Sequence, residues 1–259
     1  MSKVERVTSS DGTSIAFERT GSGPALIAVD PAGSYRDFRP QRPPVELLAP
    51  HFTVYTYDRR GRGLSTDTPP YAVEREVEDL AALVAEAGGS AFVYAMSSGG
   101  LLALHAAAAG LAIPKLALFE PPIEAGETPV GESAFTAELA ELVAAGRRRE
   151  AVAFFHREIG VPEEVMAQTP PAVWSALEAV AHTLVYDCVI SEAMSLRLLR
   201  SVRTPTLVID SQASSDDLTG SAATIVAALP DAARRSLPGE WHGVAGEVLA
   251  PVLTGFFRG

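Results

Sequence analysis

The sequence has a single cysteine, Cys188, and comparatively few basic residues. One cysteine excludes an intrachain disulfide, and its apolar neighbours in residues 184–190 predict a buried structural thiol rather than a nucleophile. Lysine and arginine total 21 against 32 aspartates and glutamates, which gives a net charge of −11. Because nucleic acids and anionic membranes attract basic surfaces, we expect neither of them as a partner.

Long apolar runs are also missing. No window reaches the ~18 apolar residues of a membrane-spanning helix, and the N-terminal residues lack the apolar segment of a signal peptide. The cytoplasm is therefore the predicted location. Neither a metal-binding spacing such as Cys-x-x-Cys or His-Glu-x-x-His nor a dinucleotide fingerprint occurs, so the sequence predicts no metal and no cofactor.

The sequence does contain an alternation of strand-like and helix-like segments. An Asp-Gly turn between two β-rich runs predicts an N-terminal hairpin. Short apolar runs bounded by turn residues predict further strands, and helical periodicity separates them. The predicted strands are residues 4–8, 14–19, 25–29, 52–57, 91–96 and 115–119, and the helices between them are residues 73–84 and 98–109. Strand, helix and strand in succession predict a parallel sheet with right-handed crossovers.

The pattern changes after residues 120–122 (EPP). The chain then has an almost wholly helical pattern up to about residue 199, before strand character returns at residues 206–210. We interpret residues 1–122 and 203–259 as an α/β core and residues 123–202 as a helical lid inserted into it. Such an insert would cover the carboxyl ends of the strands, where ligands bind in α/β sheets.

One segment predicts a strand, a tight turn that contains serines, and a helix. A nucleophilic serine on such a turn needs small residues two positions before and after it, because the turn is sharp. Ser97 meets this requirement with Ala95 and Gly99, whereas Ser98 as nucleophile would place the bulky Met96 at one of these positions. The helix that begins at Ser98 also directs free N–H groups at the turn. Ser97 is therefore the candidate nucleophile.

Six short motifs are spread along the chain. They are Asp11-Gly12 in the hairpin, residues 58–65 (DRRGRGLS), the turn at Ser97, residues 120–122, residues 205–208 (PTLV) and residues 239–242 (GEWH). In this order they resemble the α/β-hydrolase family, in particular its lidded bacterial members, over nearly the whole length. The resemblance implies an α/β-hydrolase fold, which is a mostly parallel central sheet flanked by helices with an inserted helical lid. It also implies a catalytic triad in the order serine, acid, histidine.

His242 is the candidate base. It follows a short strand and a Pro-Gly turn, which is where the family places its base. The competing histidines are His51, before a strand, His105, in the helix after Ser97, and His156 and His182, in the predicted lid.

The acid has two candidates. The family usually takes it from the loop after the seventh strand, but the resemblance puts Ser214 at that position. Asp216 follows slightly later, and its ordinary role would be to start the next helix. Glu120 ends an apolar strand at the carboxyl edge of the sheet, where some relatives carry their acid and where burial without a partner would be costly. We favour Glu120 and keep Asp216 as the alternative.

The loop after the third strand departs from the family pattern. In place of the usual His-Gly, the sequence has Asp30, Pro31, Ala32 and Gly33. Proline has no N–H, so the predicted oxyanion donors are the N–H groups of Ser98 and Ala32, with Gly33 taking the place of Ala32 if the register shifts. Asp30 would lie beside the site, where a carboxylate opposes an oxyanion unless it is protonated or turned away.

These motifs lead to two hypotheses. The first is a serine hydrolase that cleaves an ester, thioester or related acyl bond of a small, mainly apolar molecule through an acyl-enzyme. The second, motivated by the departures at residues 30–31, 96 and 214, is a non-hydrolytic relative, either a ligand-binding protein or a biosynthetic cyclase or lyase. The predicted partner is a small-molecule substrate, and the sequence leaves the oligomeric state open. The pocket candidates are Asp30, Met96, Trp174 and Trp241.

Overall fold

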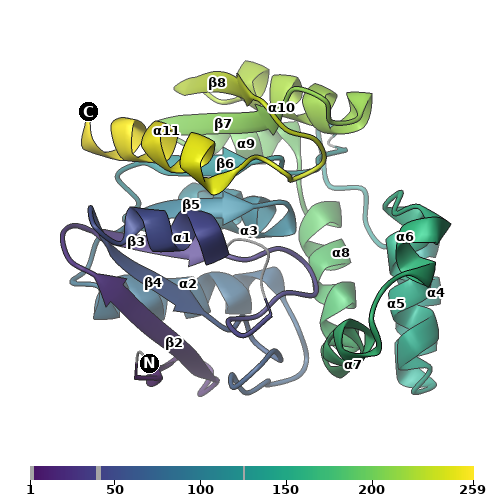
Figure 1. Cartoon of the computed structure of the whole chain (residues 1–259). Helices are drawn as coiled ribbons and strands as arrows, with labels where there is room; N and C mark the ends of the chain where they lie inside the picture. The colour runs from purple at the N-terminus through teal and green to yellow at the C-terminus, as the bar shows by residue number, and fades with distance from the viewer. Residues whose placement is uncertain (1–2, 39–41, 125) are drawn as a thin grey trace.

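An eight-stranded sheet forms the centre of the structure, a computed structural model that describes residues 3–38, 42–124 and 126–259 (Figure 1). The strand order is β1-β2-β4-β3-β5-β6-β7-β8. β1 pairs antiparallel with β2 and β2 antiparallel with β4, whereas the pairings from β4 to β8 are parallel, so the predicted hairpin and parallel sheet are confirmed. The strands are β1 (Glu5–Thr8), β2 (Ser14–Gly21), β3 (Ala25–Val29), β4 (Thr53–Tyr57), β5 (Phe92–Met96), β6 (Leu116–Phe119), β7 (Thr206–Ser211) and β8 (Ala232–Leu237).

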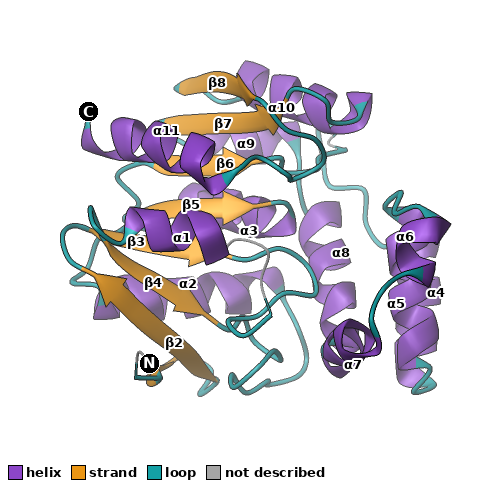
Figure 2. Ribbon diagram, viewed as in Figure 1, coloured by secondary structure: helices purple, strands orange, loops and turns teal. Residues whose placement is uncertain are grey.

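Helices cover both faces of this sheet (Figure 2). On one face, α1 (Arg42–Leu48) and α11 (Gly246–Arg258) contact each other and bury an apolar cluster that includes Leu48 and Leu253. On the opposite face, α2 (Val73–Glu86), α3 (Ser98–Ala108) and α10 (Asp216–Ala228) bury a second cluster that includes Leu101 and Ile225. The two apolar layers explain why the central strands are apolar along their whole length.

The chain between β6 and β7 forms a helical insertion, which we call the insertion below (green in Figure 1). Its helices are α4 (Ala134–Ala144), α5 (Arg148–Glu158), α6 (Glu163–Ala167), α7 (Pro171–Ala179), η1 (Ala181–Thr183), α8 (Leu184–Glu192) and α9 (Leu196–Ser201). The insertion has an apolar cluster of its own, in which Cys188 is buried beside Leu184. Burial raises the pKa of the Cys188 thiol to about 12, as expected of a structural thiol.

The three arginines of residues 58–65 are buried together with carboxylates. Arg60 binds Asp79 through two hydrogen bonds, of 2.7 Å from Nε and 2.8 Å from Nη2, and both side chains are inaccessible to solvent. Arg60 also reaches Asp11 in the β1–β2 turn at 3.1 Å. A buried charge of this kind is tolerated only with its partner in place, so these residues fix the turn after β4 against α2 and the first hairpin.

Replacing Asp79 by Asn should destabilise the fold strongly. The variant removes the more closely bound of the two carboxylates that pair with the buried Arg60 guanidinium and leaves only Asp11. Breaking a buried ion pair typically costs about 3 kcal/mol or more. Urea unfolding followed by circular dichroism measures the loss. Glu127→Gln is the control, because Glu127 pairs with Arg200 at the exposed surface and such pairs contribute little. Equal stability of Asp79→Asn and the wild type would contradict the structural role of this pair.

Candidate active site

Ser97 lies in a tight turn between β5 and α3, at the carboxyl edge of the sheet. Its φ of 51° and ψ of −130° are strained for a residue other than glycine. Its N–H donates to the carbonyl oxygen of Phe119 at 2.9 Å, which ties the turn to β6. A Cβ at Gly99 would lie 2.7 Å from the carbonyl oxygens of both Val29 and Asp30, so only glycine fits there. The backbone is thus held in the sharp bend that a presented serine hydroxyl requires.

Glu120 and His242 meet beside this turn. Met96 of β5 pairs with Phe119 of β6, so Ser97 and Glu120 follow the ends of neighbouring strands. The Nδ1 atom of His242 lies 2.7 Å from Oε2 of Glu120, and the backbone N–H of His242 donates to the same oxygen at 2.6 Å. Since Nδ1 faces Glu120, Nε2 is the ring nitrogen that remains to exchange a proton.

The carboxylate of Glu120 is fully buried and surrounded by donors. The backbone N–H of Ser211 donates to Oε1 at 2.7 Å, and the hydroxyl of Ser214 donates to the same oxygen. Burial by itself would raise the pKa of Glu120, but the hydrogen bonds from His242, Ser214 and Ser211 lower it to about 2. Ser214 occupies the position at which the resemblance places the acid, and in the structure its hydroxyl donates to Glu120 instead.

The matched family model is described as the alpha/beta hydrolase family, and it covers residues 21–251 of the chain. The chain belongs to the α/β-hydrolase family. A crystal structure of an alpha/beta hydrolase from Sphaerobacter thermophilus DSM 20745 is 47% identical, has a TM-score of 0.88, and matches 98% of this chain and 100% of that chain. The predicted family and the predicted fold class are confirmed.

Further relatives of this α/β-hydrolase are esterases. Pimeloyl-[acyl-carrier protein] methyl ester esterase from Xylella fastidiosa is 40% identical over 93 residues, a match that spans 36% of this chain and 34% of that protein. An esterase from Rhodococcus sp. ECU1013 has a TM-score of 0.67 at 22% identity, with 100% of this chain and 98% of that chain covered, and shows the common fold. This chain therefore spans about a third of the methyl ester esterase, and it shares its fold with the Rhodococcus esterase.

One predicted oxyanion donor directly follows Ser97, and the other lies in the loop after β3, the strand that neighbours β5. Ser98 is the first residue of α3, so its N–H has no acceptor within the helix. Ala32 lies in the loop after β3, where the N–H of Ser34 donates to the carbonyl of Pro31 at 3.3 Å and Gly33 has a φ of 69°. Ala32 also packs against the apolar cluster of the insertion, so this loop of the α/β-hydrolase core is covered by insertion helices.

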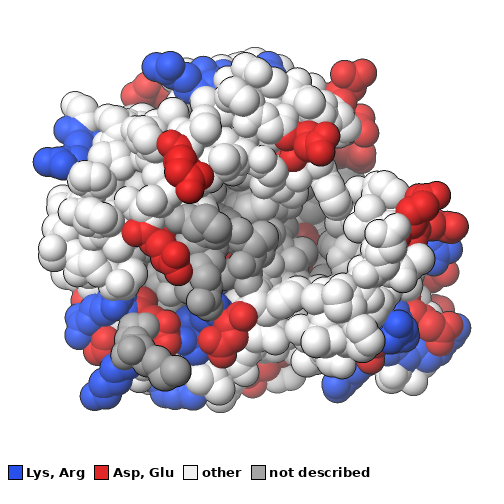
Figure 3. All heavy atoms as spheres, in the orientation of Figure 1, with Lys and Arg blue, Asp and Glu red and all other residues white. Residues whose placement is uncertain are grey.

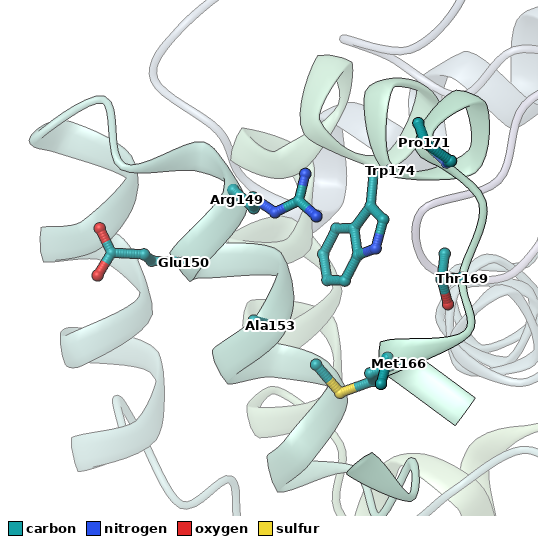
Figure 4. A pocket seen from close by; sticks show the side chains of 8 residues that line it. Arg149, Glu150, Ala153, Met166, Thr169, Pro171 and Trp174 are labelled. Carbon is teal, nitrogen blue, oxygen red and sulfur yellow. The ribbon is translucent and has the colours of Figure 1, made fainter. Parts of the chain in front are cut away.

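Two of the pocket candidates line cavities. Met96 lines a cavity of about 230 Å³ together with Phe119 and the ring of His242. Trp174 lines a different cavity of about 520 Å³ between α5, α6 and α7, where Figure 4 shows its indole facing the guanidinium of Arg149. The guanidinium carbon is 4.3 Å from the centre of the Trp174 ring. In the space-filling view of Figure 3, the surface is hollowed between the core and the insertion.

The other two pocket candidates line neither of these cavities. Asp30 directly follows β3 and is buried, with only 2% of its surface exposed. Trp241 is 43% exposed, and its ring stacks near that of His242 with centres 5.9 Å apart. Trp241 and His242 have φ angles of 28° and 63°, so two consecutive residues of this loop are in a conformation that side chains rarely adopt.

The alternative acid, Asp216, has a different environment. It is exposed in the first turn of α10, with Ser215 as the N-cap residue, whereas Glu120 contacts His242. An acid in the first turn of a helix suits the positive end of the helix dipole. The geometry therefore favours Glu120 as the partner of the base.

Two of the competing histidines contact backbone carbonyls of helices. Nε2 of His105 lies 3.2 Å from the carbonyl oxygen of Ile190, and Nδ1 of His156 lies 2.9 Å from that of Val152. Burial lowers the pKa of both rings, which suits neutral packing residues.

In the part of the chain that the structure describes, neither a metal centre nor a continuous membrane span is found. Across residues 3–38, 42–124 and 126–259, no group of three or more His, Cys, Asp or Glu side chains is arranged to hold a metal ion. In the same ranges no single helix has the length and apolarity to cross a membrane, although one bent pair, Pro171–Ala179 with Ala181–Glu192, meets both criteria.

The stability that Glu120 contributes should depend on pH. The folded pKa of about 2 lies below the ordinary value of 4.5, so ionised Glu120 stabilises the fold above about pH 4.5, and this contribution is lost as the pH falls toward 2. We expect the wild type to be more stable than Glu120→Gln near pH 7 and the difference to vanish near pH 2. Urea unfolding of both proteins over this range, with Asp216→Asn as the control, measures it. A difference that grows at low pH would contradict the assignment.

Proposed function

We propose that the chain is a serine hydrolase that cleaves an ester, thioester or related acyl bond of a small, mainly apolar molecule through an acyl-enzyme. The observation that carries this proposal is the 2.7 Å contact between His242 Nδ1 and the buried carboxylate of Glu120, beside the strained turn at Ser97. A serine on a sharp strand-to-helix turn, an imidazole and a carboxylate form a nucleophile, base and acid set.

In the proposed mechanism, the Ser97 hydroxyl attacks the carbonyl carbon of the substrate. His242 accepts the hydroxyl proton at Nε2 and passes it to the leaving alcohol or thiol, which departs as the acyl-enzyme forms. His242 then takes a proton from water, the resulting hydroxide attacks the acyl-enzyme, and the proton returns to Ser97 as the acid product leaves. Glu120 keeps the ring oriented and stabilises its cationic form, because it remains ionised at neutral pH.

The oxyanion of each tetrahedral intermediate is assigned to the N–H groups of Ser98 and Ala32. The N–H of Ser98 stands at the positive end of α3 and is unsatisfied within the helix. Ala32 is favoured as the second donor for two reasons. Pro31 has no N–H, and a hydrogen bond within residues 31–34 holds the turn that contains Ala32. Donors fixed before the reaction begins need no reorganisation as charge develops.

The substrate class is inferred from the surroundings of His242 and from the relatives. Apart from Glu120, the ring of His242 has apolar neighbours, because Phe119 and Trp241 lie beside it and Met96 lines the same cavity as His242. The curated relative named above is a methyl ester esterase, which favours an ester over an amide. Trp174 remains a proposed pocket residue of the insertion, where Arg149 already covers one face of its ring.

Ser97→Ala should abolish turnover of a short p-nitrophenyl ester and labelling by a fluorophosphonate. The hydroxyl is the proposed point of covalent attachment, so no other residue should take its place. Gel fluorescence and mass spectrometry of the labelled peptide measure this. Ser175→Ala, on an exposed face of α7, is the control and should label like the wild type. A wild type that neither labels nor turns over esters would contradict the proposal and favour a non-hydrolytic relative.

Glu120→Gln should lower kcat far more than Asp216→Asn. Without the negative charge, the cationic form of His242 loses its stabilisation and its ring orientation, and losses of about 10³- to 10⁴-fold are typical of such changes. Steady-state kinetics with the same ester measures both variants. Comparable losses in the two variants, or a larger loss in Asp216→Asn, would remove Glu120 from the proposed triad.

A further inference from the structure

One carboxylate of the insertion reaches into the core beneath the Ser97 turn. Oδ1 of Asp187, on α8, accepts a hydrogen bond of 2.7 Å from Arg59, and Oδ2 accepts one of 2.6 Å from Arg62. The three side chains are at most 2% exposed. Burial alone would raise the pKa of Asp187, but Arg59, Arg62 and the Ser98 side chain hold it below its ordinary value. Asp187 is therefore an ionised group between two guanidinium groups of the core.

The guanidinium of Arg62 continues from Asp187 to the loop after β3. Its Nη1 donates to the carbonyl oxygen of Pro31 at 2.8 Å and to that of Ser34 at 3.3 Å. In a trans peptide the C=O and N–H bonds point in opposite directions. A donor that holds the Pro31 carbonyl therefore also fixes the direction of the Ala32 N–H, which points away from Arg62.

Asp187 is also adjacent to the other proposed oxyanion donor. Ser98, whose backbone N–H is that donor, has its side chain beside the Asp187 carboxylate. Arg59 reaches the carbonyl oxygen of Asp30 at 3.5 Å, the atom against which Gly99 of the turn is packed. The Asp187 carboxylate is thus linked to both proposed oxyanion donors, through Arg62 to the Pro31–Ala32 peptide and through its own neighbour Ser98.

The neighbouring pair Arg60 and Asp79 provides a contrast. It is also a buried arginine–carboxylate pair, although Arg60 binds Asp79 through two hydrogen bonds and Arg62 binds Asp187 through one. The further contacts of Arg60 go to Asp11 and to the carbonyl of Arg75, so among the described residues this pair has no hydrogen bond to the loop after β3.

We infer that Asp187 is a positioning residue, which acts through Arg62 to hold the Pro31–Ala32 peptide so that the Ala32 N–H faces the oxyanion formed at Ser97. This inference rests on the proposed function. It makes the insertion part of the catalytic apparatus, because α8 supplies the charge that fixes the Arg62 guanidinium.

Asp187→Asn and Arg62→Lys test the inference, with Asp79→Asn as the matched control. Asn accepts hydrogen bonds without charge, and Lys cannot bind Asp187 and two carbonyls through a planar fork. We expect each variant to lower kcat by about 100-fold, which is the usual consequence of a misplaced catalytic group. KM should change by less than about threefold, because the oxyanion donors act on the transition state. Binding of a boronic acid that mimics the tetrahedral intermediate should weaken in parallel. Asp79→Asn should retain kcat and boronate affinity despite its lower stability.

Two results would overturn the inference. One is a kcat and boronate affinity for Asp187→Asn within about twofold of the wild type. The other is an equal loss of kcat in Asp79→Asn, which would mean that any buried charge defect in this region has the same effect. If Asp187→Asn does not fold, Arg62→Lys provides the same comparison. If the wild type itself has no hydrolase activity, the proposed function fails. The positioning role is then tested by crystal structures of the variants. An unchanged orientation of the Pro31–Ala32 peptide in these structures would overturn it.

Discussion

The structure depends on keeping the carboxylate of Glu120 charged although the side chain is fully buried. Burial favours the neutral form of Glu120 and so raises its pKa. Hydrogen bonds from the N–H of Ser211, the hydroxyl of Ser214 and His242 outweigh this effect and keep the carboxylate ionised. These partners come from the end of β7 and from the loops after β7 and β8, so Glu120 and His242 meet only where the carboxyl ends of β6, β7 and β8 lie side by side. In return, Glu120 binds both the backbone N–H and the ring of His242 and holds that loop in its strained conformation.

The sequence predicted the sheet, most helices and the Ser97 turn because local pattern specifies them. Apolar runs of strand length, helical periodicity and small residues around Ser97 are properties of neighbouring positions. The short helix α1 was not predicted, since it has seven residues, two of which are prolines, and is stabilised by packing on α11. The choice between Glu120 and Asp216 also stayed open, because it depends on which carboxylate the distant residues Ser211, Ser214 and His242 surround.

The contact between Asp187 and Arg62 shows a second limit of local pattern. The two residues are 125 positions apart in the sequence. Asp187 lies in the apolar segment around Cys188, and the sequence pattern there predicts only that the cysteine is buried. An aspartate in the apolar stretch of a buried helix is itself a signal, because a buried charge requires a partner. The motif at residues 58–65 does not indicate which carboxylates its arginines bind, because only the fold brings α8 to them. Core and insertion are therefore joined by charge as well as by apolar packing.

A crystal structure of the protein after reaction with a boronic acid, or with a fluorophosphonate that loses fluoride, is the most direct test of the proposed mechanism. We expect a covalent bond from the inhibitor to the Ser97 oxygen, with His242 Nε2 facing that bond. One inhibitor oxygen should lie about 2.7–3.1 Å from the N–H groups of both Ser98 and Ala32. An adduct on another residue, or an oxygen directed away from these two N–H groups, would contradict it.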